Sequence, residues 1–259
     1  MRKMLIIGNW KMNLNVSQAG RLVEQLHQHI KTQRNVEVVL APSMLALQPV
    51  SLQIDRRRFR LAAQDAFYVD EGAYTGEVSF AMLRELVHYA IIGHSERRLY
   101  FHESLETVRD KVTAAVRNEI VPILCIGENK QERQAKETKQ VVHDQLTTAL
   151  SNLTSADIES TVIAYEPVWA ISTFGGEFAK PDDVSEMITF IRQQIADLYG
   201  QRSAEAIRVL YGGSVDDQIA SGYLNLDGCD GALVGNASLH YFKFAEIVAI
   251  AERSQSRKA

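Results

Sequence analysis

Glu166 is the residue whose setting points most directly to chemistry. It follows the short apolar run 161–165 and precedes Pro167, which has no N–H and ends the run as a sheet strand. A carboxylate held at the end of a buried strand can act as a general base. The alternative is a buried glutamate paired with a cation. The next stretch, 172–180, holds Gly175-Gly176 and two phenylalanines, and we expect it to be a flap that closes beside the base.

Other short apolar runs also end in polar or glycine residues. These are Asn9, Lys11, His94, Gly212, Gly213, Ser214, Gly235 and Asn236. Each has an ordinary alternative: a surface lysine, a histidine satisfied by a backbone group, or glycines that only make turns. Taken together, backbone N–H groups at the last five positions predict an anion site, and a lysine at the same mouth favours a small phosphorylated substrate. A carboxylate base opposite an electrophile suits proton abstraction next to a carbonyl.

These residues need a scaffold that brings strand ends together. Apolar runs at 5–9, 36–41, 61–64, 89–93, 120–126, 161–165, 208–212 and 231–234 alternate with segments of helical periodicity, among them 44–54, 80–87, 131–150, 215–221 and 242–251. Eight strands, each followed by a helix, predict an α/β fold with a single (β/α)8 barrel. The alternative is a doubly wound open sheet. However, the first run ends in Gly8-Asn9-Trp10-Lys11, which is not a dinucleotide-binding fingerprint.

The amino-acid composition further limits the classes of protein to which this chain can belong. With 259 residues, 46% hydrophobic, and no linker-like tract, we expect residues 1–259 to form a single domain. The net charge is −4 and the longest basic run is 56–58, so we expect no nucleic-acid partner. Cys125 and Cys229 form no metal-type pair, and no apolar stretch or leader pattern predicts a membrane span or secretion. We therefore expect a cytoplasmic protein without a metal.

At this point a family resemblance becomes visible along the whole chain. The chain resembles the triosephosphate isomerase family in the segments GNWKMN (8–13), EGAYTGE (71–77), IGHSERR (92–98), CIGE (125–128), AYEPVWAI (164–171), YGGSV (211–215) and GALVG (231–235). None of these is a generic phosphate-binding pattern. The resemblance implies interconversion of dihydroxyacetone phosphate and glyceraldehyde 3-phosphate through an enediolate, a reaction of glycolysis and gluconeogenesis, with no cofactor.

The resemblance also implies roles for individual residues. Glu166 would be the proton-shuttling base, and His94 the electrophile, as a neutral imidazole next to the N-terminus of the turn that follows it. Lys11 would stabilise the enediolate and the phosphate, and Asn9 would orient the substrate. Backbone N–H groups of Ser172, Ser214, Gly235 and Asn236 would bind the phosphate, whereas Glu96 would brace nearby cations. The connection from Asp65 to Ser79 would enter a partner subunit, which implies a homodimer.

Two departures from the family pattern keep alternatives open. The flap, 172–178, is two residues longer than usual, lacks the usual lysine and carries Phe174 and Phe178. Asn236 replaces a glycine, but it tolerates positive φ and keeps its N–H. The alternative functions are isomerisation of a related sugar phosphate, such as a tetrulose phosphate, and a catalytically silent binding barrel.

Overall fold

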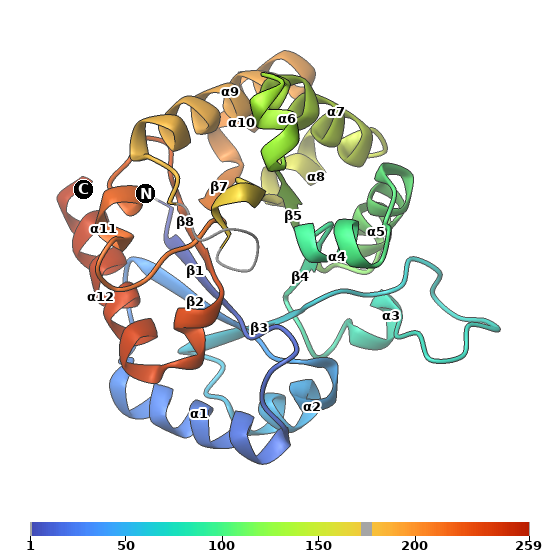
Figure 1. Cartoon of the computed structure of the whole chain (residues 1–259). Helices are drawn as coiled ribbons and strands as arrows, with labels where there is room; N and C mark the ends of the chain where they lie inside the picture. Colours follow the sequence, from blue (N-terminus) through green and yellow to red (C-terminus); the bar gives the residue numbers. More distant parts are fainter. Residues whose placement is uncertain (1, 172–177, 259) are drawn as a thin grey trace.

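The computed structural model describes residues 2–171 and 178–258, and its sheet is a closed barrel of eight parallel strands (Figure 1). The strands follow one another in chain order, and β1 closes the barrel by pairing with β8, with Leu5 opposite Gly231. The strands are β1 (Met4–Asn9), β2 (Val36–Ala41), β3 (Phe59–Ala63), β4 (Tyr89–Ile92), β5 (Val121–Ile126), β6 (Val162–Tyr165), β7 (Arg208–Tyr211) and β8 (Gly231–Val234). The predicted (β/α)8 barrel is thus confirmed, and the open sheet is excluded.

Helices surround the barrel. They are α1 (Val16–His29), α2 (Met44–Gln53), α3 (Phe80–Leu83), α4 (Ser95–Tyr100), α5 (Leu105–Arg117), α6 (Lys130–Gln134), α7 (Thr138–Leu150), α8 (Ser155–Ser160), α9 (Pro181–Tyr199), α10 (Gln201–Ala206), α11 (Ala220–Leu224) and α12 (Tyr241–Lys258). Two short 3₁₀ helices, η1 (Val168–Ala170) and η2 (Asn236–Leu239), follow β6 and β8.

The apolar core has two layers because both faces of the sheet are buried. Along β1, Leu5 and Ile7 belong to the cluster inside the barrel, whereas Met4 and Ile6 belong to the larger cluster between barrel and helices. Successive side chains of a strand point to opposite faces, so most positions of such a strand are apolar. Each buried Leu or Ile side chain contributes about 1.5–3 kcal/mol to folding.

A polar cluster closes the barrel at the N-terminal ends of the strands. Arg208 donates to Glu37 at 3.0 Å and to the hydroxyl of Tyr89 at 2.9 Å, and that hydroxyl donates to Glu37 at 2.9 Å. Burial raises the pKa of Tyr89 to about 12, so its hydroxyl stays protonated and can donate. The polar groups of these three side chains are hydrogen-bonded to one another, so this end of the barrel is closed. The opposite end of the barrel remains available for a site.

Three predicted helices are split, displaced or shortened in the structure, and the predicted helix 242–251 extends to Lys258 in α12. The predicted helix 131–150 is two helices, α6 and α7, because Lys136 adopts a positive φ of 62° that ends α6. The predicted helix 215–221 is replaced by turns, and helix α11 starts only at Ala220. The predicted helix 80–87 shortens to α3. Helices α4, α8 and α10 were not predicted, because segments of six residues carry too little periodicity.

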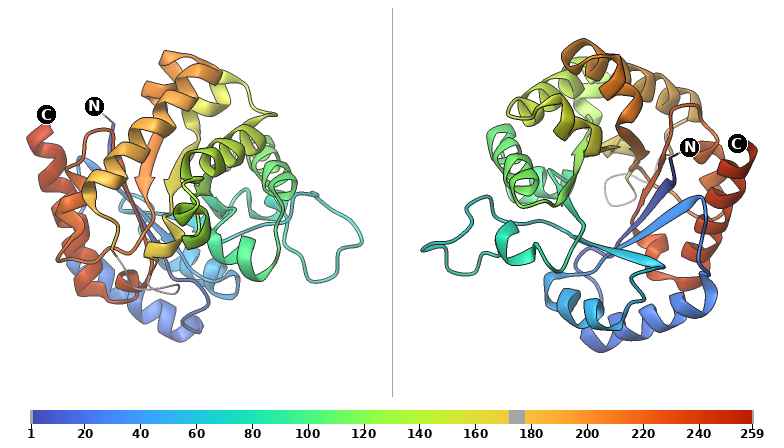
Figure 2. Two further views of the ribbon diagram at one scale, coloured as in Figure 1. Left: turned by 45° about the horizontal axis from the view of Figure 1, so that its top comes forward. Right: turned by 180° about the vertical axis from the view of Figure 1, so that it is seen from behind.

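The connection 65–79 between β3 and α3 extends away from the barrel (Figures 1 and 2). A bridge between Phe67 and Ser79 pairs its two limbs. At its root, the buried ammonium of Lys111 contacts Asp65 at 2.7 Å and also Glu103. The root is therefore anchored to α5, although the tip projects into solvent.

Candidate active site

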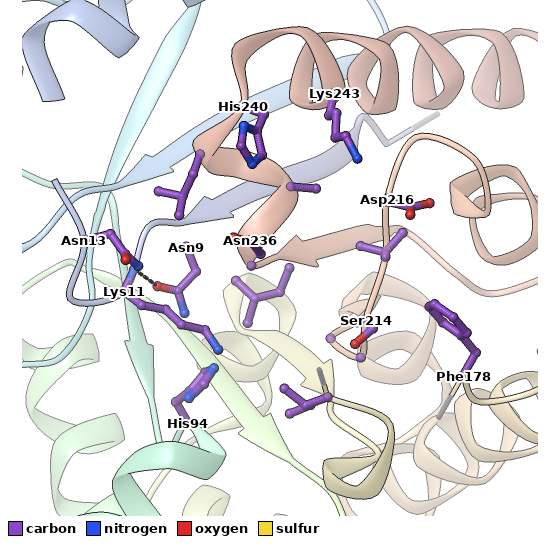
Figure 3. Close-up of a pocket in the computed structure, with 18 residues that line it drawn as sticks. Asn9, Lys11, Asn13, His94, Phe178, Ser214, Asp216, Asn236, His240 and Lys243 are labelled. Atoms are coloured by element: carbon purple, nitrogen blue, oxygen red, sulfur yellow. Dashed lines mark hydrogen bonds between the residues drawn. The ribbon is translucent and has the colours of Figure 1, made fainter. Parts of the chain in front are cut away.

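A pocket of about 490 Å³ opens at the C-terminal ends of the strands (Figure 3). Eight residues that the sequence predicts for the site line this pocket: Asn9, Lys11, His94, Gly212, Gly213, Ser214, Gly235 and Asn236. They come from the ends of β1, β4, β7 and β8. Glu166 lies just behind them, fully buried at the end of β6. Ser172 lies outside the described residues.

Lys11 is held by the turn that follows β1. Its φ of 52° is in the left-handed region, and its N–H donates to the side chain of Asn9 at 3.1 Å. The amide of Gln64, directly after β3, donates to the Lys11 carbonyl at 2.9 Å. The Lys11 ammonium forms an ion pair with Glu96 at 2.6 Å. This ion pair fits the bracing role expected for Glu96, and it presents Lys11 to the pocket.

Glu166 and His94 contact each other. The Glu166 Oε1 lies 3.2 Å from His94 Nε2, and its Oε2 accepts a hydrogen bond from the backbone N–H of Ser95 at 3.0 Å. The other ring nitrogen of His94, Nδ1, accepts from the N–H of Glu96 at 3.2 Å, at the start of α4. Because Nδ1 is an acceptor, a neutral His94 carries its proton on Nε2, facing Glu166 and the pocket.

Close contacts with neighbouring backbone segments fix the position of Glu166. Its N–H donates to Ile126 on the neighbouring strand at 2.7 Å. Gly212 leaves room for its side chain, since a Cβ at that position would lie 2.8 Å from the Glu166 Cγ. The thiol of Cys125 is also adjacent, and burial together with the Glu166 charge raises its pKa well above the ordinary value. Cys125 is therefore a neutral neighbour and not a competing base.

The expected phosphate end of the pocket differs in one respect from the prediction. The N–H of Ser214, expected to bind phosphate, donates instead to Ala170 at 3.1 Å. The buried hydroxyl of Ser214 has no hydrogen-bond partner among the described residues. Gly235 precedes the 3₁₀ helix η2, which begins at Asn236. An anion bound here would have to replace the Ala170 carbonyl at the Ser214 N–H.

A buried carboxylate supports the segment next to the base. Glu128 accepts from the Trp169 indole at 2.8 Å and from the Tyr165 hydroxyl at 3.1 Å. Burial raises the pKa of Glu128, although these donors oppose the shift. The guanidinium of Arg133 lies 4.1 Å above the Trp169 ring. These contacts position η1, which directly follows Glu166-Pro167.

Several pocket residues were missed from the sequence. Asn13, Asp216, His240 and Lys243 line the pocket, but they lie in loops or on the first turn of α12. Gln64, which supports Lys11 from outside the pocket lining, could have been found, because it directly follows β3. Among the described residues, no three His, Cys, Asp or Glu side chains are placed to share a metal ion. None of the helices in the described part of the chain is long and apolar enough to cross a membrane.

Comparison with known proteins gives a consistent result along the chain. A family model described as triosephosphate isomerase matches residues 4–251. The chain is similar to the triosephosphate isomerase of Caldanaerobacter subterraneus subsp. tengcongensis, with 46% identity over 249 residues, 96% of this chain and 99% of that protein. It is also similar to those of Chloroherpeton thalassium (44% identity, 97% of this chain and 100% of the relative) and Geotalea uraniireducens (44%, 97% and 100%).

Proposed function

Because the chain belongs to the triosephosphate isomerase family, we infer that it interconverts dihydroxyacetone phosphate and D-glyceraldehyde 3-phosphate. This is an aldose–ketose isomerisation of glycolysis and gluconeogenesis. The observation that carries the residue assignments is the contact between the buried carboxylate of Glu166 and the Nε2 of His94, at the wall of a pocket that also holds Lys11.

The reaction moves one proton between two carbons. Glu166 removes a proton from the carbon next to the substrate carbonyl, while the Nε2–H of His94 donates a hydrogen bond to the carbonyl oxygen as negative charge develops there. Lys11 stabilises the resulting enediolate. A proton also passes from the hydroxyl oxygen to the former carbonyl oxygen, and Glu166 returns its own proton to the neighbouring carbon, so the carboxylate is regenerated. To reach the substrate, Glu166 leaves the N–H of Ser95, to which it is bonded in this structure.

The phosphate end of the pocket accepts a dianion. In this proposal, backbone N–H groups of Gly235, Asn236 and Ser172 bind the phosphate, and the Ser214 N–H joins them after it leaves the Ala170 carbonyl. The Lys11 side chain passes beside the same loop, with its Cε 3.7 Å from the position of a Cβ at Gly235. A single lysine therefore reaches both the reacting carbons and the phosphate loop.

The alternative substrate, a four-carbon ketose phosphate, has no support in the described residues. Its only basis is the departure at 172–178, of which 172–177 lie outside the described residues. The relatives, which this chain matches along nearly their whole length, are named triosephosphate isomerases. A direct comparison of kcat/KM for three- and four-carbon phosphates tests this assignment, and a preference for the four-carbon substrate would overturn it.

The electrophile is tested by replacing His94. His94→Gln keeps a hydrogen-bond donor but changes its acidity and reach, and we expect kcat to fall more than KM changes. His29→Gln, on the exposed face of α1, is the matched control. Nitrogen NMR of the unmodified protein should show a neutral imidazole protonated on Nε2. A cationic ring at neutral pH would contradict the assignment.

We also propose a single domain that forms a homodimer through loop 65–79. The ladder between β1 and β8 joins both ends of the chain in one barrel. Large apolar side chains are exposed on the loop, at Tyr74, and on other segments, at Met12, Leu45, Met82, Leu99 and Phe101. Met12 is 96% exposed, and burying such a side chain against a second subunit would stabilise the assembly. Sedimentation equilibrium should give twice the chain mass, and a monomer at micromolar concentration would contradict the proposal.

A further inference from the structure

The pocket contains a second lysine, far from Lys11 in the chain. Lys243 lies on the first turn of α12 and lines the outer end of the pocket, beside His240 and across from Asp216 (Figure 3). Sequence patterns did not assign a role to it, because it follows no strand directly. In the view of Figure 3, Asn236 lies between the side chains of Lys11 and Lys243.

The two lysines differ in how strongly their charge is compensated. The Lys11 ammonium lies 2.6 Å from the carboxylate of Glu96, which is a close, hydrogen-bonded ion pair. The Lys243 ammonium lies 3.8 Å from an oxygen of Asp217, which is beyond hydrogen-bonding distance. Its side chain is 47% exposed, so it can move without disturbing the core. Lys243 is therefore a loosely held cation at the entrance.

The net charge of the chain opposes the approach of a dianion. The chain carries a net charge of −4, and the carboxylate of Asp216 lines the pocket together with the cations Lys11 and Lys243. A phosphorylated substrate therefore experiences net repulsion before it reaches the pocket. A cation at the rim of a cleft offsets it and raises the rate at which an anion enters.

We propose that Lys243 is a positioning residue that attracts the substrate phosphate toward the loop at Gly235-Asn236 and raises the rate of productive binding. The proposal rests on the proposed function, since it assumes a phosphorylated substrate. Lys243 takes no part in proton transfer. The carboxylate of Asp217 opposes this attraction, because its negative charge partly cancels the positive charge of Lys243.

The test measures kcat and KM at two ionic strengths. At about 10 mM ionic strength, where the Debye length is about 30 Å, Lys243→Met should lower kcat/KM about three- to tenfold, through KM. At about 0.15 M, where that length is about 8 Å, the difference should shrink to about twofold or less. Lys243→Arg, which keeps the charge, should retain at least half of the kcat/KM of the unmodified protein.

Two further variants separate attraction from a structural role. Lys139→Met removes one positive charge and one exposed ion pair, with Glu186 on another helix, and should leave kcat/KM unchanged. Asp217→Asn should raise kcat/KM at low ionic strength by about 1.5- to threefold. If Lys243 and Asp217 acted only as a structural ion pair, both substitutions would lower activity, and the thermal midpoint would fall with it.

Binding of inorganic phosphate gives a readout that does not need turnover. Titration followed by NMR or calorimetry should give a weaker phosphate affinity for Lys243→Met than for Lys139→Met. Glyceraldehyde, which lacks the phosphate, should be isomerised equally by Lys243→Met and the unmodified protein. Equal phosphate affinity in the two lysine variants, or a fall in kcat at constant KM, overturns the proposal. Normal phosphate binding without triose phosphate turnover would instead refute the proposed function and leave Lys243 as an anion-attracting residue.

Discussion

Gly212→Ala should impair the base without touching its carboxylate. A methyl group at this position would lie 2.8 Å from the Glu166 Cγ and 3.2 Å from the Tyr165 carbonyl oxygen. Ordinary contacts of a Cβ begin near 3.4 Å, so the Glu166 side chain must move by about 0.6 Å or more. A misplacement of about 1 Å costs about a hundredfold in rate. We therefore expect kcat to fall about ten- to hundredfold, a barrier increase of about 1.4–2.7 kcal/mol.

The assay is steady-state turnover of glyceraldehyde 3-phosphate, with thermal unfolding measured in parallel. Gly222→Ala is the matched control, because Gly222 lies in α11 and the added Cβ would meet only Pro181 Cγ, at 3.8 Å. Replacing a glycine inside a helix should stabilise the fold by about 0.5–1 kcal/mol. We expect kcat to stay unchanged. The reasoning is refuted if Gly212→Ala keeps kcat within about twofold of the unmodified protein while folding normally.

Three other substitutions test the base, the interface and the root of the loop. Glu166→Asp withdraws the carboxylate by about one bond length, so kcat should fall about a hundredfold or more; near-normal turnover would assign the proton to another group. Thr75→Arg should shift sedimentation toward monomer with loss of activity, and an intact active dimer would remove the loop from the interface. Lys111→Met leaves Asp65 and Glu103 with the partly exposed Arg97 as their remaining cation and should lower the free energy of unfolding by about 1.5–3 kcal/mol in urea titrations. Burial already raises the Asp65 pKa, against the opposing charge of Lys111, so this loss should be larger at pH 7 than near the ordinary carboxyl pKa, and equal losses would contradict it.

The strands and their ends could be predicted from the sequence, because every strand of the barrel is buried on both faces. A strand buried on both faces reads as a continuous apolar run, and the polar residue after it marks the open end of the barrel. Asn9, His94 and Glu166 were found in this way. The break between α6 and α7 was not, since Lys136 is a good helix former and nothing local indicates its positive φ.

The parts of the site that depend on tertiary contacts could not be predicted. The bond from the Ser214 N–H to Ala170 joins the loops after β7 and β6, and no local pattern encodes it. The same holds for the ion pair between Lys11 and Glu96, which are 85 positions apart. Lys243 reaches the pocket only because α12 packs beside β1 at the closed seam of the barrel.

That seam also determines when the protein can finish folding during synthesis. β1 (Met4–Asn9) is synthesised before its partner β8 (Gly231–Val234), so one edge of β1 stays unpaired until β8 has been made. Pairing across such a distance makes folding slow. Once closed, the seam holds the chain ends together: Gln255 donates to the Arg2 carbonyl at 2.7 Å. The ends could therefore be joined and the chain opened elsewhere, for example between α6 and α7, giving a permuted protein in which β1 and β8 pair early and the pairing of β5 with β6 closes the barrel last.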